Sequence, residues 1–212
     1  MDALPFLTPH FFLSSMNQTA SRHSTIALGW VLSTVLGGAI AGWFVQVSGG
    51  FLGDFLTGFV IGMAQYFAVA RLVQYSWLWV LATGVGWILG WGNILSPLPL
   101  GSLAEALHSI FSLPESLFLL TFSNAMQLML IGLAQWLILS RQFQKTWIWL
   151  PTSILGGGVL GLVGASFCAG YCDTLMVSVG RDVLGIALGS VSWLSYALIT
   201  LPALLAIARR PS

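Results

Sequence analysis

Long apolar segments separated by short polar breaks make up most of this chain. Six of them approach the roughly 20 residues that a helix needs to cross a bilayer: residues 25–47, 51–72, 76–96, 114–139, 146–167 and 183–207. Gly49 and Gly50 separate the first two, Pro97 ends the third, and the Ser-Leu-Pro-Glu sequence from Ser112 is typical of a helix start. The pattern predicts an all-α membrane protein with six transmembrane helices.

Charged residues are rare, with seven Lys or Arg and six Asp or Glu among 212 residues. Because about a quarter of the residues in a soluble domain are charged, this chain cannot cover a water-exposed surface. The basic residues are scattered singly, which excludes the basic face that nucleic-acid binding requires. The expected surroundings are therefore a lipid bilayer, and nucleic acid is not an expected partner.

The distribution of the basic residues predicts how the helices are oriented. Six of the seven lie at one set of helix ends, and only Arg181 lies at the other. Because cytoplasmic helix ends are enriched in Lys and Arg, we expect both termini in the cytoplasm. Residues 1–24 should form a cytoplasmic or interfacial segment, and residues 25–209 a single six-helix transmembrane domain. The six cytoplasmic residues are Arg22, Arg71, Arg141, Lys145, Arg209 and Arg210.

One stretch of sequence occurs twice, 70 residues apart. GMAQYFAVARLVQYSWLWV at residues 62–80 aligns with GLAQWLILSRQFQKTWIWL at residues 132–150, so that Gln65 matches Gln135. A weaker copy of its first half ends at Arg209 and has Ala203 in the place of the glutamine. The phrase covers the end of one predicted helix, a cytoplasmic turn and the start of the next helix.

The start of the second helix in this phrase also has a third copy. WVLSTVLGG (30–38), WVLATGVGW (79–87) and WLPTSILGG (149–157) align without gaps. Together the copies predict three parallel helical hairpins with approximate threefold pseudo-symmetry about an axis along the membrane normal. The tryptophans of these copies lie near the cytoplasmic helix ends, where we expect them to join the aromatic belt at the membrane surface.

Pairs of glycines four residues apart recur in the predicted helices. This spacing removes side chains from one helix face, and small residues let helices approach closely in a lipid environment that offers no hydrophobic driving force between them. We therefore expect these glycines at helix–helix contacts, and we expect the same of Gly185 and Gly189 in the last helix. The other pairs are Gly38 and Gly42, Gly58 and Gly62, Gly86 and Gly90, and Gly157 and Gly161.

Four amide side chains are the main polar features inside the predicted spans. Gln65 and Gln135 lie about two turns inside the cytoplasmic helix ends, while Asn124 and Gln127 lie nearer the other side. One interpretation is a hydrogen bond that joins two helices, for example to a neighbouring carbonyl or to a hydroxyl such as those of Thr83 or Ser153. The other is a polar lining for a central cavity or vestibule.

Cys168 and Cys172 are the only cysteines, in a loop that faces the oxidising side of the membrane. A disulfide between them is one alternative, and two free thiols at a helix end are the other. Two cysteines without a nearby histidine are too few ligands for a zinc site, so we predict no metal. The pair Glu105 and His108, in the loop at 97–113, fits an interfacial amphipathic helix better than a di-metal site.

The repeated pattern Gly-x-Ala-Gln-Trp-x-x-Leu-x-Arg, followed by Trp-x-Trp and a glycine-rich span, resembles a group of bacterial polytopic membrane proteins, many of them cyanobacterial. The resemblance covers about residues 25–209, with Tyr66 in place of one tryptophan and no third glutamine. It implies the same helical bundle in a bacterial inner (plasma) or thylakoid membrane. The group has no common activity to carry over.

The function that this sequence favours is an integral membrane structural or interaction module, such as an accessory subunit, anchor or assembly factor. Pumps and ion-coupled carriers place ionisable residues inside the bilayer, and the predicted spans have them only near their ends. Other membrane subunits or self-association are the expected partners. The alternative is a channel or facilitator for a small neutral solute, lined by the glutamines.

We expect no enzymatic activity, because no nucleophile has a matching base within reach by sequence. We also expect no cofactor. A pigment-binding subunit, with His108, Gln65, Gln135 or Asn124 as ligand to a tetrapyrrole metal, is a variant of the first function that nothing in the spacing requires.

Overall fold

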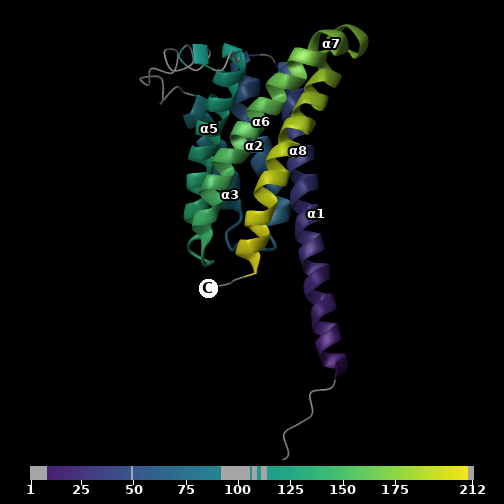
Figure 1. Cartoon of the computed structure of the whole chain (residues 1–212), viewed down its shortest axis with the longest axis vertical. Coiled ribbons are helices and arrows are strands. Elements are labelled where there is room, and N and C mark those ends of the chain that lie inside the picture. Colours follow the sequence, from purple (N-terminus) through teal and green to yellow (C-terminus); the bar gives the residue numbers. More distant parts are fainter. Residues whose placement is uncertain (1–8, 49, 92–105, 107–108, 111–113, 210–212) are drawn as a thin grey trace, which may run out of the picture.

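The computed structural model describes residues 9–48, 50–91, 106, 109–110 and 114–209, and it is an all-α bundle (Figure 1). A 3-10 turn, η1 (Thr146–Ile148), precedes the helix at Trp149–Phe167, and a π turn, η2 (Cys168–Cys172), follows it. The helices are α1 (Pro9–Ser48), α2 (Gly50–Val69), α3 (Trp77–Trp91), α5 (Glu115–Leu139), α6 (Trp149–Phe167), α7 (Asp173–Val179) and α8 (Arg181–Ala208).

Six of the described helices, all except the short α7, correspond to the six predicted apolar segments. Four stretches are long and apolar enough to cross a membrane: His23–Ser48, Leu117–Leu139, Thr146–Val179 and Arg181–Ala208. The remaining two helices carry shorter apolar stretches, Phe55–Val69 and Trp77–Gly90. The structure thus agrees with a multi-pass membrane protein whose apolar helices contact lipid.

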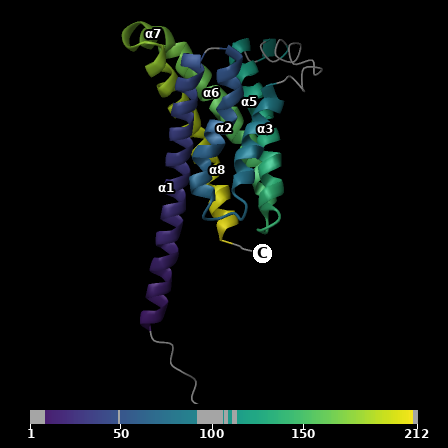
Figure 2. The same cartoon turned by 180° about the vertical axis from the view of Figure 1, so that it is seen from behind.

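Helix α1 is 40 residues long and continues far beyond the end of the bundle (Figures 1 and 2). It begins at Pro9, a residue that suits the first turn because its missing N–H would have no helical partner there. Residues 9–24 thus continue the helix of the first span.

The six long helices form a closed ring in chain order. Helix α1 packs against α2 and α8, α2 against α3, α3 against α5, α5 against α6, and α6 against α8. The end of α8 and the turns after α2 and α5 lie at one end of the bundle, and α7 lies at the other (Figure 1). At that other end the chain reverses at Gly180, whose φ of 87° favours glycine.

The turns after α2 and α5 are alike in conformation and touch each other. Among the described residues, Tyr75 and Lys145 are the only non-glycine residues with positive φ, at 60° and 56°, and they occupy matching places in the repeated phrase. The Gln142 side chain accepts a hydrogen bond from the backbone N–H of Gln74 at 2.7 Å and donates one to the backbone carbonyl of Gln74 at 3.0 Å. Residues 61–80 and 131–150 also share their burial pattern, except that Val73 is more buried than Phe143.

Candidate functional site

Three tryptophans from different helices meet inside the ring. Trp30 of α1, Trp79 of α3 and Trp149 of α6 are each 0% exposed. Their ring centroids lie 6.2, 5.7 and 5.6 Å apart, each pair in edge-to-face geometry. Aromatic pairs of this kind contribute about 0.5–1.5 kcal/mol beyond the apolar area they bury. The tryptophan triad therefore fills the centre of the bundle.

The prediction that these tryptophans join an aromatic belt at the membrane surface is therefore wrong for all three, which include Trp30 and the inner tryptophan of each Trp-x-Trp pair. Trp79 and Trp149 point inward, whereas Trp77 and Trp147 are 55% and 66% exposed. Helix geometry explains the difference, because positions two residues apart lie about 200° apart around the axis. Only the outer tryptophan of each pair is placed to face the surroundings of the bundle.

The two repeated glutamines each join three helices through the triad. The Trp79 indole N–H donates to Gln65 Oε1 at 3.0 Å, and Gln65 Nε2 lies 3.4 Å from Thr34 Oγ1 of α1. Gln65 itself lies on α2, so its amide connects α1, α2 and α3. Its side chain is 1% exposed, and both ends of the amide are engaged.

Gln135 on α5 repeats this arrangement one hairpin later. The Trp149 indole donates to Gln135 Oε1 at 3.1 Å, and Gln135 Nε2 donates to Thr83 Oγ1 of α3 at 3.0 Å. The Thr83 hydroxyl in turn donates to the Trp79 carbonyl at 2.8 Å. The tryptophan lies fourteen residues after the glutamine in both cases.

The third tryptophan of the triad, Trp30, is hydrogen-bonded to a threonine and not to a glutamine. The Trp30 indole donates to Thr200 Oγ1 of α8 at 3.1 Å, and Ala203 is buried one turn away. Tyr196 of α8 is also buried here and lies near Ser153. The buried Ser153 Oγ nevertheless has no hydrogen-bond partner. The repeat shows that the third glutamine is missing but does not point to Thr200, because nothing in the sequence says that α8 lies beside Trp30.

The second amide pair, Asn124 and Gln127, lies farther from the turns after α2 and α5 than Gln65 and Gln135 do. Gln127 is buried and donates across the α3–α5 contact to the Trp87 carbonyl at 3.3 Å. Asn124 donates to the Leu120 carbonyl of its own helix at 2.8 Å. Gln127 thus lies between two helices, as Gln65 and Gln135 do, while the amide of Asn124 is used locally.

The paired glycines lie where helices touch. Gly38 and Gly42 of α1 face Trp193 and the backbone of Gly185 and Gly189 on α8, closely enough that an added Cβ would overlap these atoms. The other three pairs contact α3 or α5 in the same way. Gly58 and Gly62 face Thr83 and Trp87, Gly86 and Gly90 face Ile131 and Gln127, and Gly157 and Gly161 face Leu128 and the backbone of Asn124, Leu120 and Thr121.

A small cavity of about 210 Å³ lies between the helices beyond the triad. Gln46, Thr57 and Ser192 are among its polar lining residues. Thr57 precedes Gln65 by eight residues of α2, which is about 12 Å at ~1.5 Å per residue, so the cavity lies toward the end of the bundle that carries α7. The tryptophan triad lies between this cavity and the turns after α2 and α5, and it fills the bundle axis there.

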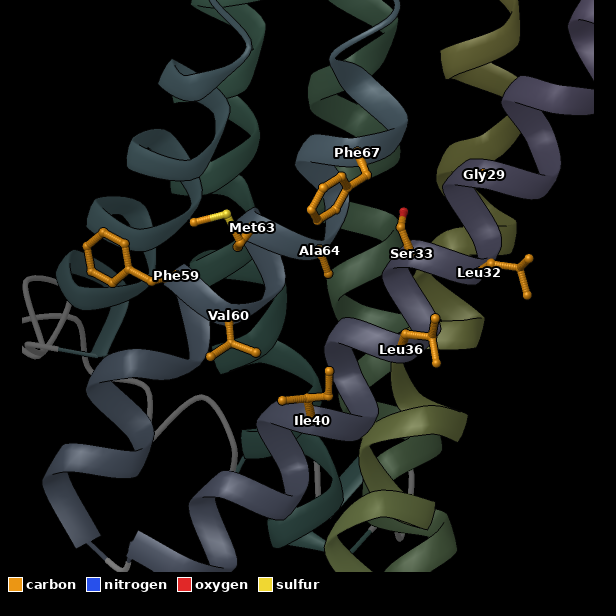
Figure 3. Close-up of a pocket in the computed structure, with 10 residues that line it drawn as sticks. All are labelled: Gly29, Leu32, Ser33, Leu36, Ile40, Phe59, Val60, Met63, Ala64 and Phe67. Atoms are coloured by element: carbon orange, nitrogen blue, oxygen red, sulfur yellow. The ribbon is translucent and has the colours of Figure 1, made fainter.

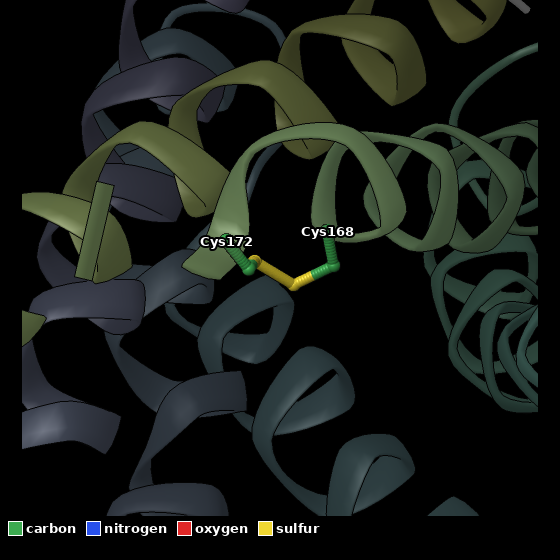
Figure 4. The surroundings of a disulfide bond; sticks show 2 residues. All are labelled: Cys168 and Cys172. Carbon is green, nitrogen blue, oxygen red and sulfur yellow. A yellow bond between two sulfur atoms is a disulfide. The ribbon is translucent and has the colours of Figure 1, made fainter. Parts of the chain in front are cut away.

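Cys168 and Cys172 form a disulfide within the π turn between α6 and α7 (Figure 4). This π turn leads directly into α7, which lies at the end of the bundle opposite the turns after α2 and α5 (Figure 1). No group of three His, Cys, Asp or Glu in the described part of the chain is arranged to hold a metal ion. Glu105 and His108 lie outside the described residues.

Where the structure describes burial, the buried polar side chains are all neutral hydroxyls and amides. The site can therefore hold helices together through hydrogen bonds, but it presents no charge for ion binding or proton transfer. The chain matches no protein-family model, and no curated protein or solved structure shows significant similarity to it.

Proposed function

We propose that this chain is an integral membrane structural or interaction module, such as an accessory subunit, an anchor or an assembly factor. The observation that carries the proposal is the closed axis of the bundle, which is occupied by three tryptophans and their hydrogen-bonded partners. A transporter or channel needs a path for its solute and commonly lines it with polar or charged groups. A packed, neutral centre instead suits a rigid scaffold that presents its outer helix faces to other subunits.

The same proposal includes three parallel hairpin repeats with approximate threefold pseudo-symmetry. The three proposed hairpins are α1 with α2, α3 with α5, and α6 with α8. Three observations support it: the near-equal sides of the tryptophan triad, the matching glutamine bonds, and the two turn residues with positive φ. The resemblance to bacterial polytopic membrane proteins is in keeping with such a bundle in a plasma or thylakoid membrane.

The orientation with both termini in the cytoplasm also belongs to the proposal. The basic residues of the two turns and of the α8 end support it through the positive-inside rule. A reporter that is active only in the cytoplasm, fused after Ser212, should be active. If the fused chain inserts normally but the reporter is inactive, the C-terminus lies on the other side of the membrane and the proposed orientation is wrong.

Reconstitution tests the structural role against transport. Proteoliposomes containing the protein should take up small neutral solutes such as glycerol or urea no faster than empty liposomes. Native mass spectrometry after mild purification should show either a defined self-assembly or a membrane subunit bound at fixed stoichiometry. Solute uptake well above the empty-liposome rate would refute the structural role.

A facilitator for a small neutral solute is the second candidate, because a cavity with polar groups lies on the α7 side of the triad. Replacing both Gln65 and Gln135 by leucine separates the two functions. If the glutamines hold helices together, the double variant loses thermal stability and its uptake equals that of the parent protein. A stable double variant with selectively reduced uptake would favour the facilitator.

A further inference from the structure

A continuous groove runs between α1 and α2 on the outside of the bundle. It consists of two adjoining hollows of about 700 and 390 Å³ that share Gly29, Leu32 and Phe67. The larger hollow is almost entirely apolar (Figure 3). Its walls are formed chiefly by Leu32, Leu36 and Ile40 of α1 and by Phe59, Met63 and Phe67 of α2.

The groove opens where the packing of α1 against α2 changes along the helices. At Gly37 the helices are in close contact, and an added Cβ would lie 2.8 Å from the Cβ of Ala64. At Gly29 the nearest atom to an added Cβ is the Cβ of Ala68 at 3.8 Å. In the aligned copies of the repeated phrase, the residue at the place of Gly29 is Leu78 or Ile148. The glycine therefore leaves space at a position where the other two copies have larger side chains.

The end of the groove nearest the α2–α3 turn is polar and positively charged. The smaller hollow is lined there by Ser24, Thr25 and Arg71. Arg71 is exposed at the start of the turn, and the exposed Tyr75 and Trp77 follow it. Tyrosine and tryptophan prefer the headgroup level of a membrane, so the Arg71 guanidinium lies where lipid phosphates are expected.

The length of the groove matches one leaflet of a bilayer. From Thr25 to Ile40 it follows fifteen residues of α1, or about 22 Å at ~1.5 Å per residue. Half of a bilayer, headgroups included, is about 20–22 Å thick. An apolar groove of this length with an arginine at its headgroup end complements an anionic phospholipid in both shape and charge.

We propose that the α1–α2 groove is a specific binding site for one anionic phospholipid, in the leaflet on the side of the membrane where the α2–α3 turn lies. An acyl chain lies along Leu36 and Met63, and the phosphate binds the Arg71 guanidinium. The inference holds whether the protein is a structural module or a facilitator.

The repeat supplies a matched control for Arg71. Arg141 occupies the same place after α5 and is also exposed. Its hairpin has Leu78 at the place of Gly29, and α3 begins only at Trp77, so α3 does not extend past Arg141 as α1 extends past Arg71. Removing either arginine changes the net charge equally, but only Arg71 lies at the proposed site.

Native mass spectrometry of the full chain, released from nanodiscs of equal phosphatidylglycerol and phosphatidylcholine, tests the proposal. The parent protein should retain one phosphatidylglycerol. Arg71→Gln should lower that preference about fivefold, as expected for one basic residue at an anionic surface, and Arg141→Gln should not. Gly29→Leu should expel lipid of either kind, whereas Gly29→Ala should keep it.

Two results would overturn the proposal. Equal lipid retention by Arg71→Gln and Arg141→Gln would show that only net charge matters, and this comparison stands even if Gly29→Leu fails to fold. A dimer in the parent protein that Gly29→Leu converts to a monomer would show that the groove holds a second copy of this chain.

Discussion

Replacing Gln135 by leucine should destabilise the bundle through a single hydrogen-bonded group. Leucine is similar in size to glutamine, so the change opens little cavity. It removes two bonds, from the Trp149 indole at 3.1 Å and to Thr83 at 3.0 Å. Thr83 keeps its own bond to the Trp79 carbonyl, so the group left unpaired is the buried N–H of Trp149.

The magnitude follows from these losses. Interhelical hydrogen bonds in membrane proteins are worth about 0.6–2 kcal/mol, and a buried donor without a partner costs about 1–3 kcal/mol. We therefore expect a loss of about 2–3 kcal/mol in the free energy of unfolding. For a chain of this size that corresponds to a fall of about 4–12 °C in Tm.

Thermal unfolding in mild detergent, followed by circular dichroism, measures the effect. Gln144→Leu is the matched control, because Gln144 lies exposed in the turn after α5. A double-mutant cycle with Trp149→Phe isolates the bond itself and should give a coupling of at least about 0.5 kcal/mol. If Gln135→Leu melts at the same temperature as the control, or if the cycle shows no coupling, the glutamine does not hold these helices together.

Three further changes test other parts of the bundle. Thr200→Val keeps the shape of the side chain but leaves its tryptophan partner on α1 unpaired, and chemical denaturation should show a loss of about 1–3 kcal/mol. Gly189→Ala forces a Cβ against the backbone of α1 and should cost about 1–3 kcal/mol, whereas Gly158→Ala, with 3.8 Å of clearance, should change Tm little. Cys168→Ser should lower the free energy of unfolding by about 2 kcal/mol through loss of a short closed loop. The parent protein should melt at the same temperature as this variant once its disulfide is reduced. Equal melting of the two alanine variants, or a serine variant as stable as its parent, would contradict these expectations.

The apolar segments predicted the helices well and their ends less well. The second segment was expected to reach residue 72, but α2 ends at Val69 because the chain then forms a turn that holds Tyr75 at positive φ. The first helix was expected to begin near residue 25, yet it extends from Pro9. Run length indicates where a helix crosses a membrane, whereas helix ends depend on local turn geometry and on what the backbone meets.

The face on which each side chain lies could not be read from the sequence. In a span that is apolar all round, positions that contact lipid and positions that contact another helix have the same composition. Trp77 and Trp79 are identical in kind and two residues apart, and only the packing of α3 shows that Trp79 is the buried one. The matching tryptophan at position 30 was visible in the alignment, but its meeting with the other two was not.

What the sequence determined by itself is therefore the set of apolar helices, the repeated polar positions and the glycines that permit close approach. The tertiary structure decided which groups those positions meet. Thr200 accepts the bond from Trp30 across 170 residues, although the repeat predicts a glutamine in this region and has Ala203 instead. Hydrogen-bond partners between helices depend on which helices are neighbours and on their rotation about their axes, and both are set only when all six helices pack together.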